Sequence, residues 1–320
     1  MVRIQQEALI NINMQIKLIT YNIDGLPEVL DLNKLPWILK PICWIYKLIK
    51  KTSLIKINDN NNTKQHIKFI GNYLSKSNAD IITVQENFNY NDELYFSLKD
   101  NYISDIHSGK IDFSNIRWLP YPRFKADGLN LFANDNVLIC EEQIIKWNKS
   151  NGYIDHANDL LTIKGFRFYK LLINNSADSC AIDLYNIHMD ADFYHPENCP
   201  DVSKDIAARK SQFNQLLNYI LNRYNYGINN PIIIIGDTNS YDKYHWDEEN
   251  IKYFLRNINC IPSLHAQEAY PINYNDCDRV FFINNEKCKC QLKLKECYFD
   301  TKIEESDHKP LIGVFDIVDY

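Results

Sequence analysis

Four consecutive isoleucines, Ile232–Ile235, run directly into Gly236-Asp237-Thr238-Asn239. An uninterrupted β-branched run predicts a buried strand. Gly236 ends the run, and two short polar side chains follow at the carboxyl end of the strand. Asp237 and Asn239 are two residues apart, so they point the same way if the backbone stays extended. We therefore expect a core strand whose polar end belongs to a site that handles charged oxygens.

The size and composition of the chain allow a large buried core. Its 320 residues are 45% hydrophobic and 13% aromatic, enough for one large domain or two small ones. The formal net charge of -6 supplies no overall positive field that would attract nucleic acid, so DNA binding would need a local basic patch. The sequence shows no internal repeat and no long low-complexity linker.

The N-terminal residues and the cysteines favour a cytoplasmic protein. The first 13 residues have no apolar h-region and no small-residue cleavage site, so we expect no signal peptide. Nine cysteines is an odd number and most stand alone, which favours a reducing compartment. A zinc site could be drawn from Cys277, Cys288, Cys290 and Cys297. Their spacing matches no standard zinc pattern, so we interpret them as free thiols.

Strand-like and helix-like segments are mixed along the chain. Short apolar runs bounded by polar residues predict the strands. These runs are Ile16–Tyr21, Ile81–Val84, Leu129–Ala133, Phe166–Ile173, Ala181–Ile187, Ile232–Ile235, Arg279–Ile283 and Leu311–Phe315. Apolar residues at helical spacing predict helices over His66–Ser75 and Ile206–Asn222. Because these helices are too few for a regular doubly wound sheet, we expect a single α/β domain with two packed sheets and outer helices.

The segment Leu35–Ile57 differs from the rest of the chain. It combines three aromatic residues and many Ile and Leu with five lysines, and Pro36 and Pro41 interrupt it. Its apolar runs are too short to span a bilayer. It is either a peripheral membrane contact, with its lysines facing anionic lipid, or an amphipathic helix packed on the body of the protein. We favour the packed helix, because amphipathic helices are common.

Polar residues recur at the ends of the predicted strands. They are Asn22 and Asp24, Glu86, His188, Asp237 and Asn239, Asp278, and Asp307 and His308. One carboxylate at a strand end is readily explained as a turn or cap residue. Six such places are harder to explain in this way, so we expect these residues to form one functional site.

The acidic residues of this set suit a metal ion. Glu86 with Asp307 or Asp24 offers hard oxygen ligands, which Mg²⁺ or Mn²⁺ prefers. Asp278 and His308 could form a carboxylate–imidazole pair in which the acid fixes the tautomer of the ring.

Two further residues, Asn239 and His188, are hydrogen-bond donors that could meet negative charge developing on a phosphoryl oxygen. With a metal that polarises the ester and an aligned water molecule, these are the parts of metal-assisted phosphoester hydrolysis.

The same motifs, in this order, resemble those of the endonuclease/exonuclease/phosphatase superfamily, which includes pancreatic-type deoxyribonuclease, exonuclease III, neutral sphingomyelinases and inositol-polyphosphate 5-phosphatases. They are Tyr21-Asn22-Ile23-Asp24-Gly25-Leu26, Gln85-Glu86, Asn186-Ile187-His188, Gly236-Asp237-Thr238-Asn239, Asp278-Arg279-Val280-Phe281-Phe282 and Ser306-Asp307-His308. The resemblance spans about Gln15 to Ile317. It implies a DNase I-like fold, a four-layered α/β sandwich. Residues 15–320 would form one catalytic domain after an N-terminal extension (1–14), with the segment 35–57 as an insertion.

The resemblance also implies how a metal would be bound. Matching motif to motif, Glu86 would be the principal Mg²⁺ ligand, with Asn22 beside it and Asp307 close to the metal. Asp24 matches a carboxylate of the exonuclease III branch that other branches lack.

The remaining motif residues would carry the reaction. His308 would be the catalytic histidine, held by Asp278, while His188 and Asn239 would contact the phosphate. Asp237 would orient or deprotonate the attacking water. Asp237 and His308 are competing candidates for the general base.

The residues around His188 indicate the branch. Sphingomyelinases, 5-phosphatases and pancreatic-type deoxyribonuclease carry histidine at this position, whereas exonuclease III-like enzymes tend to carry tyrosine. Asp190 and Asp192 add negative charge that would repel a DNA backbone. We therefore expect a monomeric phosphodiesterase, sphingomyelinase-like or from an uncharacterised branch, that acts on a small or lipid-linked phosphoester.

Two other functions stay open. The same metal chemistry would serve a DNA or RNA nuclease, whose activity would fall in moderate salt. A catalytically inactive relative could serve as a binding or scaffold protein. Such a relative would be expected to lack one of Glu86, Asp237, Asn239 or His308, and all four are present.

Some residues near these motifs have ordinary explanations. We expect His265 to lie at the surface. Arg209 and Lys210 could reach a phosphate, but charges on a helix are more commonly solvated. Tyr241 and Trp246 could line the entrance for substrate, although aromatic packing is about equally plausible.

Overall fold

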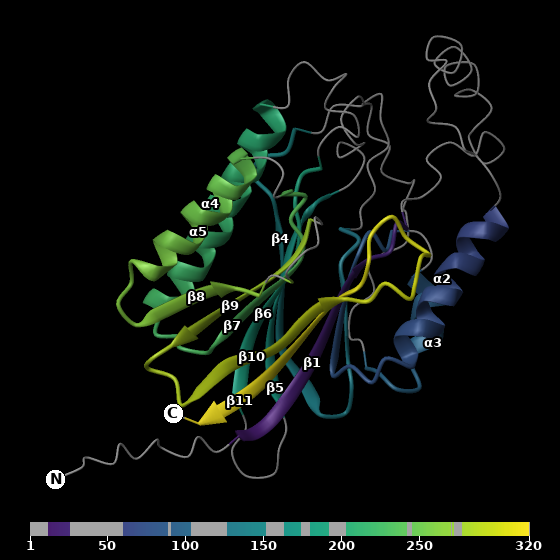
Figure 1. The fold of residues 1–320 in the computed structure, drawn as a ribbon, viewed down its shortest axis with the longest axis horizontal. Helices are drawn as coiled ribbons and strands as arrows, with labels where there is room; N and C mark the ends of the chain where they lie inside the picture. The colour runs from purple at the N-terminus through teal and green to yellow at the C-terminus, as the bar shows by residue number, and fades with distance from the viewer. Residues whose placement is uncertain are drawn as a thin grey trace.

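The strands form two mixed sheets (Figure 1). The computed structural model of the chain describes residues 12–25, 60–88, 91–103, 127–151, 163–173, 180–191, 203–241, 245–269, 271 and 277–319. A five-stranded sheet has the order β10-β11-β1-β2-β3, and a six-stranded sheet has the order β4-β5-β6-β7-β9-β8.

The five-stranded sheet consists of β1 (Ile12–Asn22), β2 (Ile81–Gln85), β3 (Asn130–Ala133), β10 (Cys290–Phe299) and β11 (Leu311–Asp319). The six-stranded sheet consists of β4 (Val137–Lys146), β5 (Gly165–Ile173), β6 (Cys180–His188), β7 (Ile232–Asp237), β8 (Leu264–Glu268) and β9 (Asp278–Asn285). The helices are α2 (Asn60–Ser75), α3 (Asn91–Leu98), α4 (Ser203–Asn225) and α5 (His245–Asn259).

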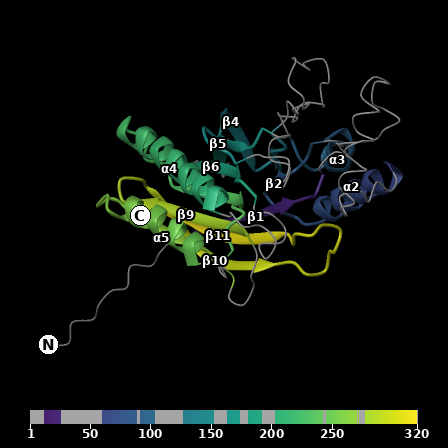
Figure 2. The same ribbon diagram turned by 90° about the horizontal axis from the view of Figure 1, so that it is seen from above.

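The sheets pack face to face and carry helices on their outer faces, as Figures 1 and 2 show from two directions. Phe213 of α4 and Phe254 of α5 pack against the six-stranded sheet. Ile67 of α2 and Leu94 of α3 pack against the five-stranded sheet. The layers are therefore helix, sheet, sheet and helix, which confirms the predicted four-layered sandwich.

The isoleucine run becomes β7, in the interior of the six-stranded sheet. Ile233 and Ile235 belong to the hydrophobic core between the sheets, whereas Ile232 and Ile234 belong to the core beneath α4 and α5. This alternation follows from the two-residue period of a strand. Complete burial of each such side chain contributes about 1.5–3 kcal/mol, so both cores fix β7 in place.

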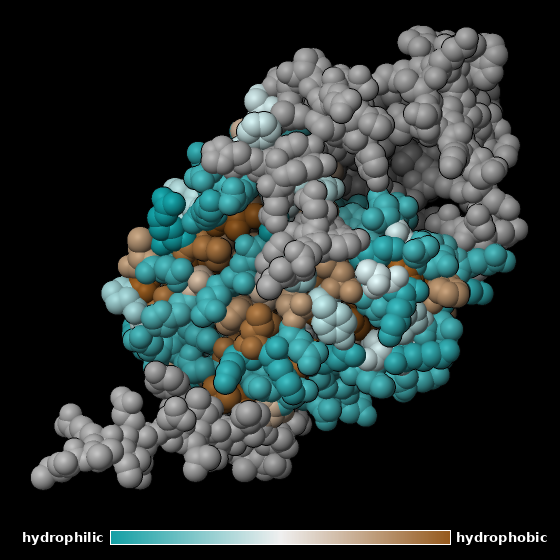
Figure 3. Space-filling view, in the orientation of Figure 1, coloured by the Kyte–Doolittle hydropathy of each residue, from teal (hydrophilic) through white to brown (hydrophobic). Residues whose placement is uncertain are grey.

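All eight predicted strands and both predicted helices are present, with longer bounds in most cases. The strands β4, β8 and β10 and the helices α3 and α5 were not predicted. Segment 35–57, which is either a membrane contact or a packed helix, lies outside the described residues. Among the residues that are described, no helix is long and apolar enough to cross a membrane. The face in Figure 3 is mainly hydrophilic, with hydrophobic residues in small separate groups.

Candidate active site

Pairing within the six-stranded sheet brings three of the predicted site residues together. Strands β6 and β7 are parallel, and their last residues, His188 and Asp237, are paired. Strand β9 runs antiparallel to β7, so its first residue, Asp278, pairs with Asp237 as well. The site therefore begins where two parallel strands end and a third, antiparallel strand begins.

The five-stranded sheet contributes in the same way. Strands β1 and β2 are parallel, with Asn22 paired to Gln85, and Glu86 follows directly. The loop before β11 is held to β1 because the Ser306 hydroxyl donates to the Asn22 carbonyl over 2.8 Å and accepts from the His308 backbone N–H over 3.2 Å. Carboxyl ends of parallel strands are common ligand sites in α/β proteins, and here two sheets supply them to one place.

The carboxylate of Asp237 lies at the centre of the site. Its oxygens accept from the side-chain amide of Asn22 (3.0 Å), the backbone N–H of Asn239 (2.8 Å) and the Asn239 side-chain amide (3.2 Å). Burial opposes its ionisation, but the charges of His308 and Lys164 and the backbone hydrogen bond from Asn239 outweigh burial and lower the pKa of Asp237 to about 2. Asp237 is therefore ionised at neutral pH.

Glu86 and Asp24 are carboxylates in an unfavourable setting. Burial raises the pKa of Glu86 to about 7, and the nearby charge of Asp24 adds to the effect. Asp24 is exposed, but the residues around it still partly desolvate its carboxylate and, together with the charge of Asp307, raise its pKa to about 6. Carboxylates whose pKa values are raised in this way are stabilised when a cation binds beside them.

His308 is held by Asp278. The Nδ1 atom of the ring lies 2.6 Å from Asp278 Oδ2, while Nε2 lies 3.9 Å from Asp237 Oδ2 and 3.9 Å from Asp307 Oδ1. Burial opposes protonation of the imidazole, but the neighbouring groups, foremost Asp278, outweigh it and hold the pKa of His308 well above its usual value. His308 therefore carries a positive charge at neutral pH, between an ionised acid on each edge of its ring.

His188 differs from His308 in its protonation state. It is fully buried, and neither ring nitrogen has a hydrogen-bond partner among the described residues. Its Nε2 atom lies 3.6 Å from both Glu86 Oε1 and Asp237 Oδ2. Burial, aided by the charge of Lys164, holds the pKa of His188 well below its usual value. A neutral buried imidazole without a partner is suited to a ligand that supplies one.

Three of the site residues have a left-handed backbone. The φ angles are 46° at Asp24, 61° at Glu86 and 49° at Asn239, and in the described part of the chain Asn78 is the one other non-glycine residue with positive φ. This region is uncommon for residues with a Cβ atom and costs of order 1–3 kcal/mol. The fold therefore holds these side chains in place at the cost of local strain.

Lys164 is a site residue that the sequence analysis missed. Its side chain is buried, and its ammonium donates to the Met189 carbonyl over 3.0 Å. The side-chain amide of Asn239 donates to the same carbonyl, also over 3.0 Å. The charge of Lys164 favours the ionised forms of Glu86 and Asp237. Because β5 is antiparallel to β6, its beginning lies beside His188, so the signal would have been a lysine directly before a strand.

Asp190, which we expected to add negative charge beside His188, has its carboxylate engaged by the protein itself. Asp190 is buried, and its carboxylate accepts from the Ser150 hydroxyl (2.6 Å) and the Asn151 backbone N–H (2.8 Å). These bonds hold the loop after β4 to the end of β6. Asp192 lies outside the described residues. Repulsion of a DNA backbone by Asp190 is therefore not a reason to exclude nucleic acid as a substrate.

Arg209 is neither a phosphate ligand nor a solvated charge. It is fully buried in α4 and forms a two-pronged ion pair with Asp247 of α5, over 3.0 and 3.1 Å. A third nitrogen donates to the Asp190 carbonyl over 3.3 Å. Lys210 is exposed, as expected. Arg209 thus connects both helices of the outer layer to the end of β6.

The carboxylates of this site fit a hard divalent cation, and a neighbouring imidazole lies beside them. One ligand atom each from Glu86, His188 and Asp237 lies within 4.8 Å of the others. The amide nitrogen of Asn22 braces two of these groups, donating to Glu86 over 3.1 Å and to Asp237 over 3.0 Å, while its oxygen accepts from the Asp24 backbone N–H over 3.1 Å. A strained, desolvated carboxylate (Glu86) beside a buried imidazole (His188) whose nitrogens have no hydrogen-bond partner among the described residues is typical of a metal-binding site.

Solved structures with the same architecture cover nearly the whole chain. SmcL shares 15% identity at a TM-score of 0.57, covering 94% of this chain and 99% of that one. Sphingomyelinase C from Streptomyces griseocarneus shares 13% at 0.55, covering 94% and 99%. A beta toxin mutant from Staphylococcus aureus with bound magnesium ions shares 16% at 0.56, covering 94% and 99%.

No protein-family model matches the sequence, and no curated protein matches it either. The likeness lies in the arrangement of strands and helices and extends from end to end of the neighbouring chains. The chain has a DNase I-like fold, the four-layered sandwich that its motifs predict.

Proposed function

We propose that the chain is a Mg²⁺-dependent phosphodiesterase that acts on a small or lipid-linked phosphoester. The observation that carries this proposal is the charge pattern around Asp237. An ionised carboxylate lies between a protonated imidazole, His308, and a neutral one, His188. Acid and base groups with opposed pKa shifts at one place are typical of catalytic sites.

Glu86 is the proposed principal ligand of the metal, with Asp307, Asp24 and Asn22 around it. A bound Mg²⁺ would polarise the phosphoryl oxygen and offset its charge. The raised pKa of Glu86, about 7, supports this role, because a cation relieves the cost of burying its charge.

The proton chemistry divides between Asp237 and His308. Asp237 has a pKa of about 2, which makes it a weak base, so its role is to accept a hydrogen bond from the attacking water and orient it. His308 holds a proton at neutral pH and can donate it from Nε2 to the departing oxygen, while Asp278 fixes Nδ1. This assignment favours Asp237 for orienting water and His308 as the acid.

His188 and Asn239 are proposed to contact the phosphate. The side-chain amide of Asn239 donates to the Met189 carbonyl over 3.0 Å and to Asp237 over 3.2 Å, and it would exchange the longer of these bonds for one to a phosphate oxygen. A donor of this kind stabilises the negative charge of a transition state, and the loss of one such donor typically costs about 10²–10³ in rate.

The substrate class is supported by the fold neighbours, which include a sphingomyelinase C. Nucleic acid stays among the substrates to test, because the Asp190 carboxylate is turned into the protein. The purified chain should be supplied with Mg²⁺ and compared on sphingomyelin, phosphoinositides, plasmid DNA and a bis-p-nitrophenyl ester. We expect sphingomyelin or another lipid phosphoester to be cleaved fastest.

Two variants test the site, and a third serves as the matched control. Glu86→Gln and His308→Ala should abolish hydrolysis and remain folded by circular dichroism. His265→Ala removes an exposed histidine that lies 2.8 Å from Glu286, away from the site, and should turn over like the parent. Full activity of either site variant on a substrate that the parent cleaves would rule out this site. Cleavage confined to DNA would replace the lipid substrate by nucleic acid.

A further inference from the structure

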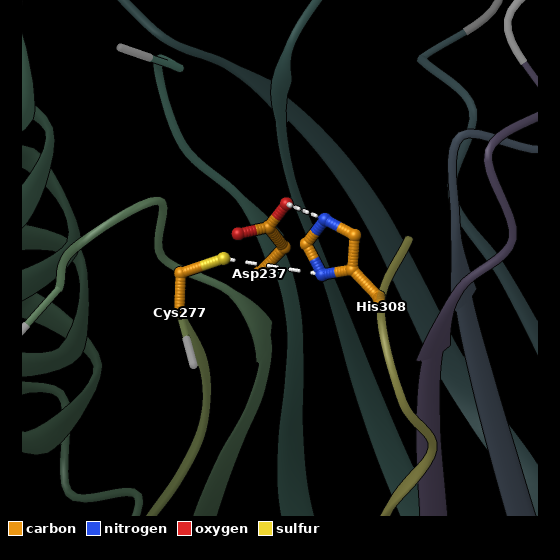
Figure 4. A group of neighbouring side chains, drawn as sticks. All are labelled: Asp237, Cys277 and His308. Atoms are coloured by element: carbon orange, nitrogen blue, oxygen red, sulfur yellow. Dashed lines mark hydrogen bonds and ion pairs between the residues drawn. The ribbon is translucent and has the colours of Figure 1, made fainter. Parts of the chain in front are cut away.

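Beside the proposed magnesium ligands, three side chains of different chemistry meet (Figure 4). They are the carboxylate of Asp237, the thiol of Cys277 and the imidazole of His308, and one ligand atom from each lies within 4.8 Å of the others. Asp237 ends β7, Cys277 directly precedes β9, and His308 belongs to the loop before β11. The proposed hydrolysis uses Asp237 and His308 but gives Cys277 no role.

We propose that Asp237, Cys277 and His308 form a second metal site, which takes a thiophilic divalent ion such as Zn²⁺ and switches the hydrolase off. Thiolate and imidazole ligands favour zinc, whereas Mg²⁺ favours oxygen alone. The proposed magnesium ligands offer oxygen alone, so the two sites differ in ligand chemistry.

The distances suit one small ion. His308 Nε2 lies 3.9 Å from Asp237 Oδ2, and one ligand atom of each of the three residues lies within 4.8 Å of the others. Zn–S and Zn–N bonds of about 2.3 and 2.0 Å at a tetrahedral centre place neighbouring ligand atoms about 3.4–3.6 Å apart. The ligand atoms would therefore need to move together by no more than about 1.3 Å.

The surroundings already orient these ligands. Asp278 holds Nδ1 of His308 at 2.6 Å, which leaves Nε2 as the ligand atom. A carboxylate behind the outer nitrogen is the usual support of a zinc-bound histidine. The backbone before β9 is also held, because the N–H and the hydroxyl of Thr238 both donate to the Cys277 carbonyl, over 3.0 and 2.8 Å.

Binding of the ion releases two protons. The ion forms bonds to the Cys277 sulfur and to Nε2 of His308, the S–H and Nε2–H bonds break, and both protons pass to solvent, with no change of oxidation state. The inhibitory consequence rests on the proposed function. An ion held by Asp237 and His308 occupies the groups that orient the water and protonate the leaving oxygen.

Cobalt spectroscopy tests the site without any substrate. The chelator-treated full-length chain should bind one Co²⁺ with thiolate-to-cobalt absorption, and one equivalent of Zn²⁺ should remove the band. Cys277→Ser should abolish the band. Cys290→Ser is the matched control, because Cys290 lies beside another thiol, Cys288, and the band should persist in it. A band that survives Cys277→Ser, or that disappears in Cys290→Ser, overturns the proposal.

X-ray absorption spectroscopy of the zinc-loaded parent tests, without any variant, whether a sulfur atom binds the zinc. One sulfur at about 2.3 Å is expected in the coordination sphere of the zinc, and the absence of sulfur overturns the site. Zinc titration at saturating Mg²⁺ then tests inhibition. With each protein compared to its own activity in Mg²⁺ alone, the Zn²⁺ concentration that halves the activity should be at least about tenfold higher for Cys277→Ser than for the parent. Equal zinc sensitivity of the two proteins contradicts the inhibitory role of the site. If the parent cleaves none of the phosphoesters, the proposed function is wrong, but the spectroscopic test of the zinc site is unaffected.

Discussion

A Cβ atom added to Gly236 would lie 2.2 Å from the carbonyl oxygen of Ile187 in the neighbouring strand. Gly236 has a φ of +136°, inside a strand whose other residues are isoleucines up to Asp237. The glycine therefore lets β7 turn against β6 at the point where both strands end. This local turn is what places Asp237 beside His188 while the strands stay paired.

Gly236→Ala should destabilise the protein and misplace Asp237. Both the backbone conformation and the contact with Ile187 oppose a side chain, so we expect a loss of at least about 2 kcal/mol in the free energy of unfolding. Denaturant titration measures it. Gly227→Ala is the control, because Gly227 also has positive φ (+84°) but no atom within 4 Å of an added Cβ. It should cost only about 1–2 kcal/mol, and an equal loss in both variants would contradict the steric argument.

Glu86→Gln should stabilise the metal-free protein while it removes activity. The pKa of Glu86 is raised from 4.5 to about 7, so the folded state binds the proton more tightly than the unfolded state does. The resulting stability is complete below pH 4.5 and is lost as the pH rises through about 7, by about 3 kcal/mol. Because glutamine has no charge to bury, the variant should exceed the parent above pH 7 in chelator and match it at pH 4. Lower stability of the variant at pH 8 would contradict this account.

Asp278→Asn should shift the alkaline limb of the pH profile. Asp278 holds Nδ1 of His308 at 2.6 Å, and its charge is the foremost cause that raises the pKa of that imidazole. Removing the charge lowers the pKa, so His308 loses its proton at a lower pH and activity falls earlier as the pH rises. The measurement is kcat/KM against pH. An unchanged alkaline limb would remove His308 from the role of acid.

Breaking the Arg209–Asp247 pair should unfold the outer helical layer. Both side chains are fully buried, so Arg209→Met leaves an uncompensated carboxylate and should cost about 3–5 kcal/mol. The double variant Arg209→Met/Asp247→Leu removes both charges and should recover much of this loss. Lys252→Met, which breaks an exposed ion pair with Glu248, should hardly change the midpoint of thermal unfolding. A double variant no more stable than the single one would contradict the electrostatic explanation.

The strands that the sequence did not predict lie at sheet edges and are partly exposed, whereas β3, also at an edge, is buried throughout and was predicted. The buried run of β7 was obvious because both of its faces are apolar. Strands β4, β8 and β10 lie at sheet edges and carry exposed polar residues such as Lys146, His265 and Lys293. In the sequences of these strands, polar residues therefore interrupt the apolar ones, and no continuous apolar run predicts a strand.

The site residues could be predicted because they lie next to apolar strands. The nine predicted residues follow strands, or stand at the beginning of β9 or before β11, and they all lie at one end of the sandwich. The orientation of Asp190 could not be predicted, because it depends on Ser150 and Asn151 in a distant loop. Arg209 was misjudged because its partner, Asp247, lies on a helix that the sequence did not reveal.

Lys164→Met should shift the acid limb of the pH profile to higher pH. Lys164 supplies a buried positive charge near Glu86 and Asp237, and its loss makes both carboxylates harder to ionise. Lys164→Arg keeps the charge and should stay close to the parent. Lys170→Met removes a lysine farther along the same strand and should leave the limb in place, because Lys170 pairs with Asp183, five residues before His188 on β6. If Lys164→Met reduced kcat with no shift of the limb, its ammonium would act by holding the Met189 carbonyl, and not through its charge on the two acids.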